Sequence, residues 1–160
     1  MSKSLAEIEI SSVDWAAHRQ IVGTAEGIPA ALLDLLNAPT PEAAKAAYWK
    51  LDNHVVVQGA LFQAAEPVVS VLLAALTETR PAHVRARLLE LLFQILAGEA
   101  AGGERALSTG PLAQACKIRA REGLWVLYGE LRKGEREVVM ECIELVETDL
   151  ARLAAFRDSV

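Results

Sequence analysis

Apolar residues along this chain recur every three to four positions, the spacing that places them on one face of an amphipathic helix. Leucines give residues 32–36 a short apolar face that ends before Asn37. The next three turn-forming positions, Thr40, Pro41 and Glu42, predict a helix start. Threonine can cap the first turn, proline fits its fixed φ, and glutamate is favoured at the positive end of the helix dipole.

The same spacing predicts four further helical segments. They run over about 61–76, 81–97, 111–134 and 135–156. Residues 55–57 are three valines in a row, but with no partner strand in the pattern we expect the end of a helix or a connection. The predicted fold class is therefore all-α.

The sequence also matches itself at an offset of 40 residues. Residues 25–33 align with 65–73, and Pro41 aligns with Pro81. A period near 40 with two helices per unit is that of HEAT and armadillo repeats, in which hairpins stack because none buries its apolar face alone. We therefore expect one domain over 1–160, a HEAT-like α-solenoid of about three to four stacked helical hairpins. A non-repeating helical bundle is the alternative.

Two segments fall outside this pattern. Residues 1–10 are expected to form a flexible N-terminal tail. Residues 98–110 contain four glycines, interrupt the period, and predict an irregular loop. Such a loop is either a degraded repeat or a contact to a partner, and the sequence does not decide between them.

Composition narrows the class of protein. Of the 160 residues 52% are hydrophobic and only 5% aromatic, so a disulfide scaffold or a disordered chain is excluded. The best apolar run, 68–76, is far shorter than the roughly 20 residues that cross a bilayer. Residues 1–10 lack the pattern of a secretory signal. We expect a cytoplasmic protein that does not bind a membrane.

Charge and reactive residues give no sign of catalysis. Sixteen Lys and Arg against twenty-one Asp and Glu leave a net charge of −5, which speaks against a nucleic-acid partner. His18, His54 and His83 share no ligand spacing, and no nucleophile elbow or phosphate loop is present. Cys116 and Cys142 stand alone in apolar stretches and predict buried free thiols. No catalytic residue, metal or cofactor is expected.

One set of short motifs resembles a known family. It comprises Trp49-Lys50-Leu51-Asp52-Asn53, Gln58-Gly59, Ala64-Ala65, Val68-Val69 and Leu72-Leu73. Over about residues 12–97 this set resembles a group of bacterial HEAT-repeat proteins, although that group often has histidine where this chain has Val57. The resemblance implies a binding module without enzymatic activity. Some of these proteins resemble immunity proteins that are paired with toxins.

Candidate binding residues lie around the tryptophan of this motif. Asp52, Asn53 and His54 follow Trp49 and could form a polar binding edge. The interpretation that we favour is structural, with Asn53 and Gln58 bonding the connecting backbone. Tryptophans on such helices usually pack between repeats, whereas an exposed one would be a candidate hot spot for a partner.

The strongest local signal is acidic. Glu137, Glu141 and Glu144 are spaced i, i+4 and i+7, so they form one stripe on a helix. The stripe is either a solvated, internally paired face or a docking surface for a basic protein. The sequence therefore predicts a protein-binding module, in its most concrete form an immunity protein that blocks a basic toxin domain. A scaffold or adaptor, and a small-ligand carrier, are the alternatives.

Overall fold

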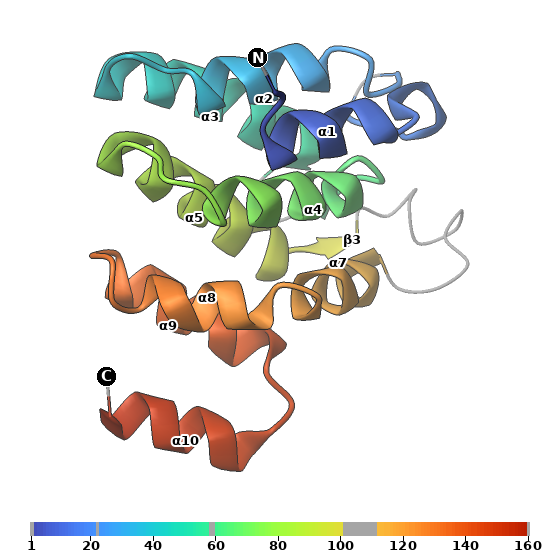
Figure 1. Ribbon diagram of the computed structural model, residues 1–160. Helices are drawn as coiled ribbons and strands as arrows, with labels where there is room; N and C mark the ends of the chain where they lie inside the picture. The colour runs from blue at the N-terminus through green and yellow to red at the C-terminus, as the bar shows by residue number, and fades with distance from the viewer. Residues whose placement is uncertain (1, 22, 58–59, 101–111, 160) are drawn as a thin grey trace.

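The computed structural model describes residues 2–21, 23–57, 60–100 and 112–159 (Figure 1). Its helices are α1 (Leu5–Ser12), the short 3₁₀ helix η1 (Trp15–Ala17), α2 (Ile28–Leu36), α3 (Pro41–Val55), α4 (Ala65–Leu76), α5 (Ala82–Leu96), α7 (Leu112–Arg121), α8 (Leu124–Glu130), α9 (Arg136–Val146) and α10 (Leu150–Ser159). Three strands of two residues each are β1 (Val56–Val57), β2 (Ala60–Leu61) and β3 (Glu99–Ala100). The all-helical class predicted from the sequence is confirmed.

The helices stack in tiers, with the N-terminus and the C-terminus near opposite ends of the stack (Figure 1). Helices α1 to α3 form the first tier, α4 and α5 the second, and α7 to α9 the third, and α10 lies beyond it. Helix α5 packs between α3 and α9, while α4 packs between α1 and α7. The molecule therefore has two layers, and α5 is the middle helix of one of them.

Helix boundaries in the first two tiers follow the 40-residue period. Helix α2 ends at Leu36 and α4 ends at Leu76. Pro41 is the first residue of α3, and Pro81 is the N-cap of α5. The predicted cap at Thr40 is present, because its Oγ1 accepts a hydrogen bond from the backbone N–H of Ala43 at 3.1 Å.

A single apolar core runs through all tiers. Its centre is the pair α4 and α5, whose buried positions are almost all leucine, valine and alanine. Apolar area removed from water stabilises the fold by about 25 cal/mol per Å², so these two helices contribute most to the free energy of folding.

The N-terminal segment differs from the expected flexible tail over 1–10. Ser4 caps α1 through a capping box with Glu7, in which each side chain accepts from the other residue's backbone N–H. The backbone N–H of Leu5 also donates to Glu78 Oε1 at 2.8 Å, and α1 packs on α4. A capping box of this kind is local in sequence, but the docking onto α4 is not.

The valine run also differs from expectation. Val55 ends α3, but Val56 and Val57 form β1, which pairs antiparallel with β2. Strand β2 pairs in parallel with β3, a segment about 40 residues later in the chain. Leu61, expected to begin a helix, lies in β2, and α4 begins only at Ala65. The partner strand was missing from the sequence pattern because two-residue strands carry no alternation.

Two segments predicted as single helices are each broken. The segment 111–134 holds α7 and α8, separated at Glu122 and Gly123. The segment 135–156 holds α9 and α10, separated by residues 147–149. Of the expected loop 98–110, Gly98 and β3 are described, whereas 101–110 lie outside the described residues, as do Gln58 and Gly59. No helix of the described ranges is long and apolar enough to cross a bilayer.

Candidate functional site

The acidic stripe lies on α9 opposite its buried side. The buried residues of α9 are Val139, Cys142, Ile143 and Val146. At 100° per residue, Glu137, Glu141 and Glu144 fall on the other side of the helix, and all three are exposed. The predicted stripe is therefore a real surface feature, directed away from the core.

Helix α3 is oriented in the same way. Its buried positions include Ala44, Ala47 and Leu51, and Trp49 and Asn53 lie opposite them and are exposed. Because α3, α5 and α9 pack side by side in one layer, these residues and the acidic stripe share its outward side. We call this side the outer face, defined by Trp49, Asn53 and the stripe on α9.

Pairing within the stripe is partial. Arg157 of α10 donates to Glu144 Oε1 at 2.9 Å, and both side chains are exposed. Among the described residues, Glu137 and Glu141 have no cation within 4 Å. Lys133, a sequence candidate for neutralising the stripe, instead contacts Glu130. Two of the three carboxylates thus remain available to an approaching partner.

Asp52 lies in a notch between α3 and α5. Tyr48 Oη donates to Asp52 Oδ1 at a long 3.4 Å, and the Arg87 guanidinium lies 5.4 Å from the centre of the Tyr48 ring. Arg87 also donates to Glu90 Oε2 at 2.7 Å. We call these four residues, with Trp49 beside them, the α3/α5 notch.

Burial in the notch shifts two pKa values. The pKa of Asp52 is raised, first because its half-buried carboxylate loses water and also because Glu90 is negative, while the bond from Tyr48 opposes the shift. The pKa of Tyr48 is raised as well, by burial and then by the charges of Asp52 and Glu90. The notch therefore has more negative charge than its one arginine neutralises.

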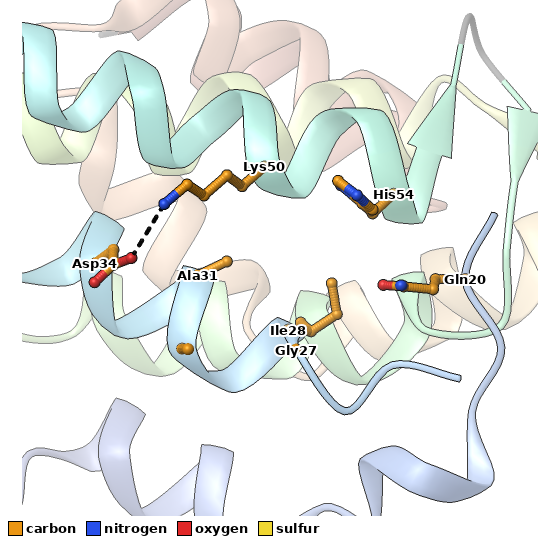
Figure 2. A pocket seen from close by; sticks show the side chains of 8 residues that line it. Gln20, Gly27, Ile28, Ala31, Asp34, Lys50 and His54 are labelled. Carbon is orange, nitrogen blue, oxygen red and sulfur yellow. Dashed lines mark ion pairs between the residues drawn. The ribbon is translucent and has the colours of Figure 1, made fainter. Parts of the chain in front are cut away.

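His54 faces a different part of the molecule from Asp52 and Asn53. It lines a cavity of about 280 Å³ between α2 and α3, together with Gln20, Asp34 and Lys50 and the first turns of α2 (Figure 2). His54 Nδ1 is buried and has no hydrogen-bond partner among the described residues. Lys50 Nζ lies 3.6 Å from Asp34 Oδ2 at the exposed side of the cavity, as Figure 2 shows. The structure thus separates His54 from the other predicted residues.

A second hollow lies on the opposite layer. It measures about 460 Å³ and is lined from α1, α4, α7 and α8, with Leu5 and Ile8 on one side and Val126 on the other. Its floor is formed by small and aliphatic residues of α4, among them Ser70 and Ala74. This groove is apolar, but nothing in the structure indicates what would cover it.

The three tryptophans have different environments. Trp15 is 6% exposed and donates its indole N–H to the Ile10 carbonyl at 2.9 Å, so it is a core residue. Trp49 and Trp125 are 45% and 64% exposed. Packing between repeats, the commoner outcome for such residues, therefore holds for Trp15 and fails for the other two. Trp49 lies on the outer face, whereas Trp125 packs on Phe156 of α10.

Sequence reasoning missed two buried carboxylates. Glu130 receives hydrogen bonds from Arg85 at 3.1 and 3.2 Å and from Lys133 at 3.2 Å. Glu147, counted in the acidic excess of the last helix, accepts from Arg152 and from Tyr128 Oη. Neither residue belongs to the outer face. No local signal distinguishes them, because Arg85 and Tyr128 are distant in sequence.

Metal and thiol chemistry have no visible basis in the described part of the chain. No group of three His, Cys, Asp or Glu there could hold a metal ion. Cys116 and Cys142 are free and buried, as predicted. Burial, followed by a nearby glutamate, raises the pKa of each thiol to about 12.

The fold and the outer face define an all-helical protein of stacked hairpins with an acidic surface. Comparisons with models of protein families, with curated proteins and with solved structures find no match to this chain. The function therefore has to be argued from the outer face itself.

Proposed function

We propose that this chain is a HEAT-like α-solenoid that binds another protein through its outer face and has no enzymatic activity of its own. Stacked helical hairpins commonly bind partners across the extended surface that their layers form. The tiers of α2/α3 and α4/α5, whose boundaries recur 40 residues apart, support this assignment. The resemblance over about residues 12–97 points the same way.

The most specific form of this proposal is a cytoplasmic immunity protein that neutralises a basic toxin domain. The observation that carries it is the outer face, where two unpaired carboxylates of the stripe share a helical layer with the exposed Trp49. Acidic residues attract a basic partner and raise its association rate, while an exposed tryptophan supplies the buried contact that holds it.

The stripe also fits a partner better than it fits the isolated protein. Glu137 and Glu141 are one turn apart on the same side of α9, and like charges at this spacing destabilise a helix slightly. A basic surface docked on them would relieve that repulsion. An acidic stripe on a nuclease-type toxin partner would replace the phosphates that such a toxin binds.

The proposal is tested by co-expressing the chain with the product of the neighbouring open reading frame. We expect that product to be basic and toxic when expressed alone, and to co-purify with this chain at low salt. A Glu137→Gln, Glu141→Gln, Glu144→Gln variant should lower the association rate about tenfold or more at low salt and less at 0.5 M NaCl. If this variant binds the partner as tightly as the parent at low salt, the acidic face is not the binding site.

The nearest alternative is a scaffold or adaptor that uses the same outer face. It shares the dependence on Trp49 and the stripe, but its partner would not arrest growth when expressed alone. A small-ligand carrier would instead use the cavity beside His54. Native mass spectrometry of the purified protein tests that alternative, since a carrier would retain bound mass.

A further inference from the structure

The α3/α5 notch already contains one stacked guanidinium. Arg87 lies over the Tyr48 ring, and Tyr48 in turn meets Trp49 edge to face, with ring centres 5.2 Å apart and planes at 76°. Arg87 approaches from α5, which lies beside α3 in Figure 1. Trp49, on the other side of Tyr48, is 45% exposed and has no such cation over it among the described residues.

The charges of the notch do not balance. Asp52 and Glu90 influence each other as like charges, and Arg87 is the cation between the two helices. The short bond from Arg87 goes to Glu90, which leaves Asp52 with the long bond from Tyr48. Within the described residues no cation lies within 4 Å of Asp52.

Helix geometry puts the unpaired carboxylate next to the exposed ring. Trp49 and Asp52 are spaced i and i+3, so their side chains are neighbours on α3. A cation that lay over the indole could therefore reach the carboxylate. Asp52 is half-buried, so its charge is screened less by water than the charges of the stripe on α9.

We propose that the α3/α5 notch binds an arginine side chain of the partner, with the guanidinium stacked on Trp49 and its N–H groups directed to Asp52. This inference rests on the proposed function, because it names the chemistry by which the outer face recognises a basic protein. Arginine fits better than lysine for two reasons. Its planar group stacks on an aromatic ring, and its fork of donors matches a carboxylate. Arg87 over Tyr48 shows the same stacking one residue away.

The notch and the stripe then have different roles. The stripe acts at a distance and sets how fast a basic partner arrives. The notch makes contact, desolvates Asp52 together with a guanidinium, and sets how slowly the partner leaves. Substitutions in the two places should consequently change different rate constants.

The direct test uses argininamide as the probe, followed by NMR of the isotope-labelled protein. We expect a saturable shift of the Trp49 indole N–H and of the Asp52 carboxyl carbon at millimolar argininamide. Asp52→Asn should weaken this binding at least fivefold. Asp34→Asn, which removes an exposed carboxylate on α2, is the matched control and should leave it unchanged.

Several results would overturn the notch as an arginine site. One is an equal titration of parent and Asp52→Asn, and another is a shift reproduced by sodium chloride alone. Equal binding of lysinamide and argininamide would overturn the choice of guanidinium. Trp49→Phe serves as a second variant, which keeps the carboxylate and should weaken argininamide about twofold to threefold while the dispersion of the spectrum confirms the fold.

Failure of this inference can be told apart from failure of the proposed function. If the partner protein binds the parent and Asp52→Asn with the same dissociation rate, while the triple glutamine variant associates slowly, the outer face stands and the notch fails. If argininamide titrates the notch but the neighbouring gene product neither binds nor arrests growth, the notch stands as an arginine site and the immunity function fails.

Discussion

Arg152 holds Glu147 with two hydrogen bonds, from Nε to Oε2 at 2.7 Å and from Nη2 to Oε1 at 3.0 Å. The Glu147 side chain is only 1% exposed, and Tyr128 Oη donates to the same carboxylate at 2.8 Å. Glu147 follows α9, Tyr128 lies on α8 and Arg152 lies on α10. One carboxylate thus fixes the C-terminal helix to the third tier, at the point where the expected single helix breaks.

Replacing this carboxylate is expected to destabilise the protein at neutral pH. Arg152 first, then the backbone N–H of Asp149 and Tyr128, lower the pKa of Glu147 from 4.5 to about 2, against the opposing effect of burial. The folded pKa lies below the unfolded one, so this stabilisation is complete above about pH 5 and is lost as the pH falls toward about 2. Glu147→Gln should lower the free energy of unfolding at pH 7 by about 2 kcal/mol.

Urea unfolding at pH 7, 5 and 3 measures this effect. The difference between parent and Glu147→Gln should shrink as the pH falls. Glu144→Gln, which removes an exposed ion pair with Arg157, is the control and should cost less than about 0.5 kcal/mol. A difference for Glu147→Gln that stays constant down to pH 3 would contradict the assignment of charge to this carboxylate.

A second buried carboxylate joins α5 to the end of α8. Both Nε and Nη2 of Arg85 bond to Glu130 Oε2, and the Glu130 side chain is 1% exposed. Glu130→Ala would leave a largely buried guanidinium without its partner, and we expect a loss of about 3 kcal/mol. The paired variant Arg85→Leu, Glu130→Leu removes both charges and should recover most of that loss. Thermal unfolding of the three proteins tests the prediction, and a smaller loss for Glu130→Ala than for the paired variant would refute it.

How far the sequence predicts this fold depends on how local each cause is. The start of α3 was predictable because Thr40 and Pro41 act within one turn. The break after α9 was not, because Glu147 is drawn out of the helix pattern by Tyr128, 19 residues away. The same holds for β1, whose parallel neighbour in the sheet, β3, comes from beyond two helices.

The candidate site divides along the same line. Spacing alone predicted that Glu137, Glu141 and Glu144 share one side of a helix, since that follows from 3.6 residues per turn. The α3/α5 notch could not be predicted, because it exists only where α5 brings Arg87 and Glu90 beside α3. His54 was grouped with Asp52 by sequence, yet their positions two residues apart place them on different sides of α3.

The two cysteines are expected to be unreactive in the folded protein. Burial raises the pKa of Cys116 and of Cys142 to about 12, so on the order of one thiol in 10⁴ is ionised at pH 8. We expect Ellman's reagent to label neither thiol within minutes under native conditions and both after unfolding in urea. Rapid native labelling of either cysteine would show that its helix opens locally far more often than the core around it.

Two glycines of the third tier offer a matched test of packing. A Cβ built on Gly129 meets nothing within 4 Å, whereas one built on Gly123 would lie 2.8 Å from both Leu73 methyl carbons of α4. Gly129 lies inside α8, so Gly129→Ala should raise the free energy of unfolding by about 0.5–1 kcal/mol through helix propensity.

Gly123→Ala should instead lower the free energy of unfolding by about 1 kcal/mol, because Leu73 must leave its rotamer or α8 must move away from α4. Combining Gly123→Ala with Leu73→Ala should remove the clash, so the double variant should be more stable than the sum of the two single effects predicts. Urea unfolding of the four proteins gives that coupling. Strict additivity would mean that α8 does not pack on Leu73 as closely as the structure shows.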